Sequence, residues 1–215
     1  MPLLAICSVV FILNAEHIES SVKVFGILKS TQLQNLRMHN LKFFCIVAAL
    51  FFATLGDIFL LEKTQKRFLL GTASFFVCHI FWITYYIHFV KSLNWYFPVI
   101  AVFVYGLATI FLYHFVGSPK GIMGIFLIAY ALILSFSNFV GLMGIITTHS
   151  LASLFCFIGS AIFIISDTAL GYSIFKTDFS KSRFIVMLTY ILAQIILALG
   201  VCVDNIGYRI ILEAL

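Results

Sequence analysis

The chain has 215 residues, of which 63% are hydrophobic and only 10% are charged. A soluble domain carries about 25% charged residues, so these few charges cannot cover a water-facing surface, and a soluble protein is excluded. The net charge of +5 does not indicate nucleic-acid binding. The basic residues lie mostly at the ends of apolar runs, where lipid headgroups explain them, and they form no basic patch interleaved with aromatic residues.

The apolar residues are gathered in continuous runs, and a transmembrane helix needs roughly 20 such residues. Alternation of polar and apolar residues, which is typical of a transmembrane β-barrel, is missing from these runs. The sequence therefore predicts an all-α fold, a polytopic bundle of transmembrane helices. We expect about eight spans in a single transmembrane domain over residues 1–215: Leu3–Asn14, Ser21–Leu36, Leu41–Leu61, Phe68–Val90, Trp95–Val116, Gly121–Thr147, Leu151–Phe175 and Phe184–Val203.

The five cysteines also lie inside the apolar runs and form no Cys-x-x-Cys pair. They are expected to be small buried side chains rather than disulfides or zinc ligands, and we predict neither a metal site nor a cofactor. The start of the chain lacks the basic region of a signal peptide, so the first run is expected to remain as a span.

Basic residues favour one side of the predicted bundle. An even number of spans places both termini on the same side of the membrane. The links after the odd-numbered spans hold more lysine and arginine than the other links, and such an excess marks the cytoplasmic side. The residues of this set are Lys63, Lys66, Arg67, Lys120, Lys176, Lys181 and Arg183, with Lys23 at their edge.

Two aspartates lie inside apolar spans, where an ionisable side chain is costly and marks function by default. Asp57 belongs to Gly56-Asp57-Ile58-Phe59-Leu60 in the third span, and Asp167 to Ser166-Asp167-Thr168-Ala169-Leu170 in the seventh. The two segments echo each other and lie four spans apart, which is compatible with a duplicated four-helix unit. With eight spans, both aspartates fall in the same half of the membrane.

Further polar side chains come to a similar depth from neighbouring spans, and together with the aspartates they would line one cavity toward the inner leaflet. They are Lys23, His79, Tyr130, Tyr190 and Gln194. A purely structural interpretation stays open for each of them. Asp57 would then pair with Lys23 to join two helices, His79 would be a core histidine, and the tyrosines would be ordinary interfacial aromatics.

The sequence around these residues resembles the lysoplasmalogenase (YhhN) family of eight-span membrane proteins. The matching segments occur in the family's order. Where the family usually shows Lys-Pro-Leu in the second span, this chain has Lys23-Val24-Phe25. The other segments are Leu55-Gly56-Asp57-Ile58-Phe59-Leu60-Leu61, then Gly71 with Phe75-Phe76-Val77-Cys78-His79, Tyr130, Gly159-Ser160-Ala161-Ile162-Phe163-Ile164-Ile165-Ser166-Asp167, and Tyr190-Ile191-Leu192-Ala193-Gln194.

This resemblance implies hydrolysis of the vinyl-ether bond of a lysoplasmalogen to a fatty aldehyde and a glycerophospho-alcohol, such as glycerophosphoethanolamine or glycerophosphocholine. It implies Asp57 and Asp167 as catalytic residues, with Lys23, His79, Tyr130, Tyr190 and Gln194 binding substrate or supporting them. The expected partners are the lysophospholipid substrate and membrane lipids, without nucleic acid. We expect the protein in the bacterial inner (plasma) membrane.

The proposed chemistry suits two carboxyl groups. A vinyl ether is protonated at carbon, and water captures the resulting oxocarbenium ion, so an acid, a cation-stabilising carboxylate and a base are needed. Two carboxyl groups with separated pKa values divide such roles in glycosidases.

Two other functions also fit buried ionisable residues. One is a small-molecule or proton-coupled transporter. The other is a metal-dependent hydrolase with Asp57, His79 and Asp167 as ligands, although the sequence has no His-Glu-x-x-His motif.

Overall fold

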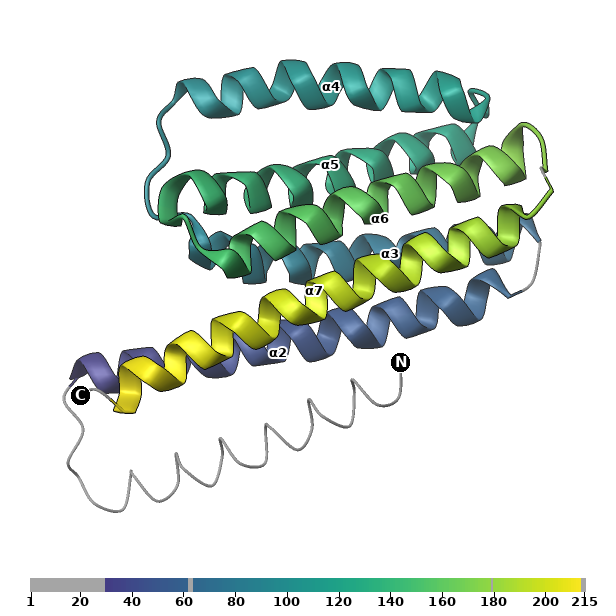
Figure 1. The fold of residues 1–215 in the computed structure, drawn as a ribbon. Helices are drawn as coiled ribbons and strands as arrows, with labels where there is room; N and C mark the ends of the chain where they lie inside the picture. Colours follow the sequence, from purple (N-terminus) through teal and green to yellow (C-terminus); the bar gives the residue numbers. More distant parts are fainter. Residues whose placement is uncertain (1–29, 62–63, 179, 214–215) are drawn as a thin grey trace. The chain divides into compact units, whose positions relative to one another are not determined.

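A computed structural model of the chain describes residues 30–61, 64–178 and 180–213. Within these ranges the protein is helical and contains no strand (Figure 1), which confirms the all-α class. The elements in chain order are α2 (Ser30–Leu60), α3 (Gln65–Tyr86), the 3-10 turn η1 (Ile87–Phe89), α4 (Tyr96–Val116), α5 (Ile122–Thr148), α6 (Leu151–Phe175) and α7 (Ser182–Glu213).

Six of the described helices are long and apolar enough to cross a membrane. Helices are suited to this because they satisfy their own backbone N–H and C=O groups where no water is available. The chain is therefore an integral membrane protein. The six segments are Asn40–Leu60, Lys66–Phe89, Tyr96–Val116, Ile122–Thr148, Leu151–Phe175 and Ser182–Asn205, close to the last six predicted spans.

The predicted count of about eight spans is not confirmed. The first predicted span, Leu3–Asn14, and the first part of the second, Ser21–Leu36, lie outside the described residues, and so does Lys23. The helix that holds the third span begins before that span, because α2 runs without interruption from Ser30 to Leu60, while its candidate membrane segment is Asn40–Leu60. Polar residues such as Arg37 and Asn40 end the apolar run there. They do not end the helix, since residues 36–41 contain neither glycine nor proline.

The chain divides into two compact units, Met1–Tyr85 and Tyr86–Leu215. Each unit is described below by itself. The single domain expected over residues 1–215 stays a prediction.

In the first unit, α2 contacts aromatic residues of α3 through a glycine and through a ring of its own. Ala49 and Ala53 are buried, and a Cβ added at Gly56 would lie 2.6 Å from the ring of Phe75. The ring of Phe81 stacks on that of Phe52 with their centroids 5.9 Å apart. The absence of side-chain bulk on α2 thus makes room for the large rings of α3, which bury most of their apolar area.

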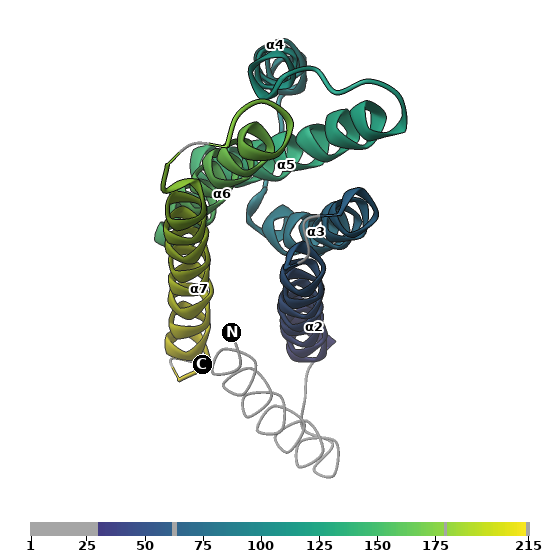
Figure 2. The same ribbon diagram turned by 90° about the vertical axis from the view of Figure 1, so that its right-hand side faces the viewer.

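In the second unit, α5 and α6 form the central antiparallel pair (Figures 1 and 2). Helix α4 packs on α5 and α6, and α7 packs along α6. The α5–α6 connection is short because His149 ends α5 in the left-handed conformation and Ser150 begins the next helix. The Ser150 side chain accepts hydrogen bonds from the N–H groups of Ala152 and Ser153, which caps the start of α6.

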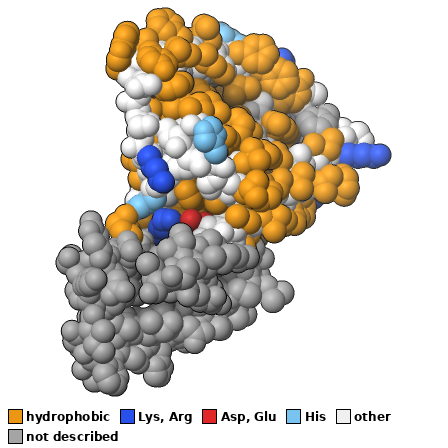
Figure 3. Space-filling view, turned by 60° about the vertical axis from the view of Figure 1, so that its left-hand side comes forward, with side chains coloured by type: hydrophobic (Ala, Val, Ile, Leu, Met, Phe, Trp, Pro, Cys, Tyr) orange, Lys and Arg blue, Asp and Glu red, His pale blue; other side chains and the backbone are white. Residues whose placement is uncertain are grey.

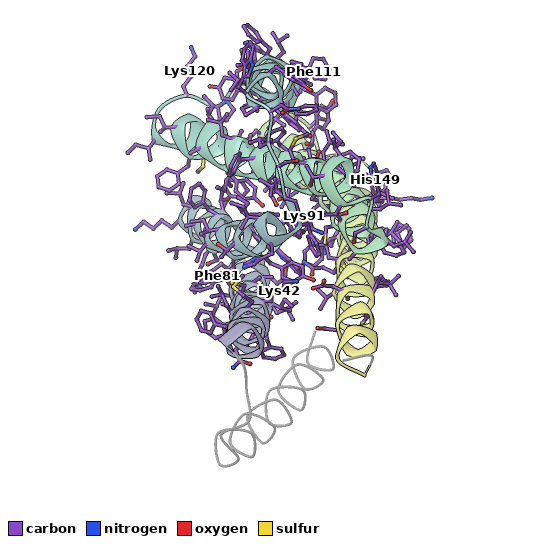
Figure 4. The ribbon with its side chains drawn as sticks, turned by 90° about the vertical axis from the view of Figure 1, so that its left-hand side faces the viewer. Lys42, Phe81, Lys91, Phe111, Lys120 and His149 are labelled. Atoms are coloured by element: carbon purple, nitrogen blue, oxygen red, sulfur yellow. The ribbon has the colours of Figure 1, made fainter. Side chains whose placement is uncertain are left out.

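The outer surface of the second unit is apolar, as lipid contact requires. Helix α4 exposes large side chains along its length, including Val102 at 72% and Phe103 at 68% of their full area. Figure 4 shows Phe111 on α4 and Lys120 pointing away from the neighbouring helices. Hydrophobic side chains dominate the face of the molecule seen in Figure 3, with few charged groups among them.

Close packing of α6 on α7 depends on glycine. A Cβ at position 159 would lie 2.6 Å from the Leu197 side chain and 3.2 Å from the Leu197 backbone nitrogen. Small residues at an interface let transmembrane helices approach closely, and this approach replaces the hydrophobic effect as a driving force between helices.

We therefore expect Gly159→Ala to lower the free energy of unfolding by about 1–3 kcal/mol, the usual cost of overpacking. Thermal unfolding of the purified protein in detergent measures the change. The matched control is Gly106→Ala on α4, where nothing lies within 4 Å of an added Cβ. That variant should be neutral or more stable, since alanine is the better helix former. Equal destabilisation by both substitutions would contradict this account of the α6–α7 interface.

Candidate active site

In the second unit, two of the predicted site residues, Tyr130 and Asp167, are in direct contact. The hydroxyl of Tyr130 on α5 donates a hydrogen bond to Oδ2 of Asp167 on α6. Tyr130 is buried and Asp167 is half-buried. A hydrogen bond with an ionised acceptor is stronger than one between neutral groups, and a medium of low dielectric strengthens it further. The tyrosine therefore fixes the orientation of the carboxyl group.

The helix register explains why these two residues meet. Tyr130 lies eight residues after the first residue of α5, and Asp167 lies eight residues before the last residue of α6. In an antiparallel pair both positions fall at the same level, about 12 Å from that end of the helices. The carboxyl group therefore lies about two turns inside a helix that is long and apolar enough to cross a membrane. The sequence predicted the depth of both residues but not their contact.

The other two predicted residues of this unit lie on α7. The ring of Tyr190 packs edge-to-face on Phe163 of α6, with the centroids 5.6 Å apart. Gln194 is one turn further along and is 4% exposed. Its Nε2 atom is buried and has no hydrogen-bond partner among the described residues. An unsatisfied buried amide costs about 1–3 kcal/mol, which makes Gln194 a candidate for binding a polar group of a ligand.

Asp57 and His79 belong to the first unit. Asp57 is half-buried in the last turn of α2 and follows Gly56, which packs on Phe75. His79 lies in α3 and is almost fully buried, at 1% exposure. The sequence placed both residues at membrane depth, and each lies on a membrane-spanning helix. Whether they share a cavity with the residues of the second unit stays a prediction, and Lys23 lies outside the described residues.

A second polar cluster of the second unit is centred on an asparagine, which a search for ionisable side chains does not select. Asn138 on α5 accepts a hydrogen bond from the Tyr105 hydroxyl at 2.7 Å. Its Nδ2 atom donates to Ser160 Oγ at 2.9 Å and to the Phe157 carbonyl at 3.0 Å. An asparagine in the middle of an apolar span is the signal in the sequence that could have revealed this cluster.

The side chains that could hold a metal ion are dispersed. Within the described ranges, no group of three or more His, Cys, Asp or Glu residues is arranged to bind one. The Asp167 carboxyl group instead has a tyrosine hydroxyl as its partner. This arrangement suits proton transfer and the stabilisation of a cation, because a positioned carboxyl group can do both.

The match to a known family covers both groups of candidate residues. The model of the YhhN family, which is lysoplasmalogenase-like, matches residues 21–201. The chain belongs to the YhhN family. Neither a curated protein nor a solved structure gives a match. The YhhN match includes Asp57 and Asp167 and nearly all of the six apolar helices, so the resemblance noted in the sequence is confirmed at the level of the family.

The Tyr130–Asp167 contact can be measured by a double-mutant cycle. Tyr130→Phe and Asp167→Ala each remove the hydrogen bond, so their effects on unfolding in detergent should be less than additive. We expect a coupling of about 1 kcal/mol or more, in the range of interhelical hydrogen bonds in membranes. The control pairs Tyr130→Phe with Asp178→Ala in the α6–α7 link, where the effects should add. Full additivity for Tyr130 and Asp167 would show that the contact does not stabilise the protein.

Proposed function

We propose that this member of the YhhN family hydrolyses the vinyl-ether bond of lysoplasmalogens. The observation that carries the proposal is the oriented carboxyl group of Asp167, held by Tyr130 at membrane depth. Family membership supports a hydrolase of this kind. As a second catalytic carboxyl group we propose that of Asp57, half-buried on a spanning helix of the first unit.

The reaction balances with water as the second substrate. One aspartic acid protonates the vinyl carbon remote from the ether oxygen, which gives an oxocarbenium ion. The other aspartate stabilises this cation and takes a proton from the attacking water. As the bond between the hemiacetal carbon and the glycerol oxygen breaks, the second aspartate gives its proton to that oxygen. The hemiacetal hydroxyl loses its proton to the first aspartate, which leaves the aldehyde. The products are a fatty aldehyde and a glycerophospho-alcohol, and the two carboxyl groups return to their first protonation states.

The charges of the second unit fit a substrate with a phosphate headgroup. The end of the helices nearer to Tyr130 and Asp167 carries several basic residues, namely Lys120, Lys176, Lys181 and Arg183. Lys176 is anchored there, since its Nζ lies 3.4 Å from the Phe115 carbonyl oxygen. An anionic headgroup held at this level would place the ether bond of the same molecule deeper, toward the carboxyl group. The apolar exterior allows the single alkenyl chain to enter from the bilayer.

The first test replaces each aspartate. Asp57→Asn and Asp167→Asn keep the size of the side chain but remove the ionisable carboxyl group. We expect each variant to fold in detergent and to lose aldehyde release from lysoplasmalogen by at least about 10²-fold, as for other acid–base residues. The double variant should be scarcely slower than either single one if the two act as a unit.

The matched control is Asp178→Asn, an exposed aspartate in the α6–α7 link, which should keep normal turnover. A lysolipid with a saturated ether chain should release no aldehyde, because it has no double bond to protonate. Near-normal turnover of either Asp57→Asn or Asp167→Asn would remove that aspartate from the mechanism. Loss of folding in both variants would instead assign them a structural role.

A second test concerns metal ions. Because the proposed steps use carboxyl groups alone, aldehyde release should continue after dialysis against EDTA. The control is the same protein dialysed without chelator. If EDTA abolishes turnover and one divalent ion restores it, the acid–base proposal is wrong and a metal-dependent hydrolysis takes its place.

A further inference from the structure

Asn138 joins three helices of the second unit. Its amide oxygen accepts from Tyr105 on α4, and its Nδ2 donates twice to α6, at Ser160 and at the Phe157 carbonyl. The side chain is 5% exposed, so these bonds lie in an apolar interior. Both N–H donors of the amide are used, which makes the cluster fully satisfied on its donor side. Such networks hold helices in one arrangement.

The cluster and the Tyr130–Asp167 contact are two successive links between the same two helices. Asn138 lies eight residues after Tyr130 on α5, and Ser160 lies seven residues before Asp167 on α6. Two turns of helix separate the links on each side, which places them on the same faces. The distance between α5 and α6 at the Asn138–Ser160 bond therefore constrains the distance between the two helices at the Tyr130–Asp167 bond.

The two links lie at different distances from the short turn that joins α5 to α6. Beyond Asn138, toward the short His149–Ser150 turn, the helices are in tight contact, with a Cβ at Gly141 only 3.2 Å from Phe157 Cα and one at Gly144 3.0 Å from Ser153 Cβ. Toward Asp167 the pair reaches its open end, where no connecting turn joins α5 to α6. Along α5, Asn138 lies between the end that is joined to α6 by the His149–Ser150 turn and the level of the Asp167 carboxyl group.

We propose that Asn138 is a positioning residue: its bonds to Tyr105 and α6 set the separation and register of α5 and α6 that bring the Tyr130 hydroxyl onto Asp167. This inference rests on the proposed function for its catalytic consequence. The geometric consequence, an open end of the hairpin that is held in one arrangement, stands without it.

The kinetic test uses Asn138→Leu, which keeps the approximate volume and removes all three hydrogen bonds. We expect kcat for aldehyde release to fall by about 10- to 100-fold with KM nearly unchanged, because a displacement of about 1 Å has this effect on a reacting group. In a Tyr130→Phe background the same substitution should cost little more, since the contact that it positions is already lost. Ser160→Ala, which leaves the bond to the Phe157 carbonyl, should have a smaller effect on kcat.

The matched control is Thr147→Val, also on α5. Thr147 Oγ1 donates to the Phe89 carbonyl at 3.0 Å near the closed end, so this variant loses a part-buried side-chain bond far from Asp167. It should lower the melting temperature and leave kcat unchanged. An equal loss of kcat in Thr147→Val and Asn138→Leu would overturn the positioning role and leave a general effect on stability.

A measurement independent of activity separates the two proposals. Spin labels at Phe126→Cys and Ile174→Cys report the open end of the α5–α6 pair, and labels at Ile146→Cys and Leu154→Cys report the closed end, with Cys7 and Cys202 replaced by alanine. Asn138→Leu should broaden the distance distribution at the open end alone. An unchanged distribution overturns the inference. If the wild type releases no aldehyde while the distribution broadens, the proposed function fails and the positioning of Tyr130 against Asp167 stands.

Discussion

The interior of a bilayer offers no water to a polar group, and this constraint shapes the whole protein. Each spanning segment satisfies its backbone as a helix, and each polar side chain at membrane depth needs a partner within its own helix, on a neighbouring helix or on a ligand. The Tyr130–Asp167 contact is the consequence for the ionisable group. The Asn138 cluster is the consequence for the amide. Both form between α5 and α6, which is why this pair organises the second unit.

The packing of the remaining helices follows from the lack of a hydrophobic driving force between segments in lipid. Association then depends on close contact, and close contact depends on small residues. Leu197 of α7 packs against Gly159 of α6, and Phe75 of α3 packs against Gly56 of α2. Helix α4 packs less closely on its neighbouring helices than α6 does, and it exposes large apolar residues such as Phe103. Its bond from Tyr105 to Asn138 is correspondingly important for its attachment.

Few polar side chains lie at membrane depth, and this suits a reaction that needs few polar groups. Vinyl-ether hydrolysis in the proposed form uses two carboxyl groups and water, and a long apolar chain brings the substrate into the bilayer. Tyr130 orients one carboxyl group, and basic residues lie at the adjacent end of the helices. Gln194 adds a buried amide donor that no described residue uses. A polar ligand group would remove the cost of leaving this donor unsatisfied.

The sequence by itself determined the helical class, the last six membrane segments and the location of Asp57 and Asp167 within two of them. Hydrophobic run length and the cost of a buried charge are local properties, so they can be read from the residues in order. Only the tertiary structure decided that α2 continues through Arg37 and Asn40, because a polar residue ends an apolar run without ending a helix. Only the tertiary structure paired Tyr130 with Asp167 and Asn138 with Ser160. These pairs depend on the rotation and register of two helices, which the short range of sequence periodicity does not specify.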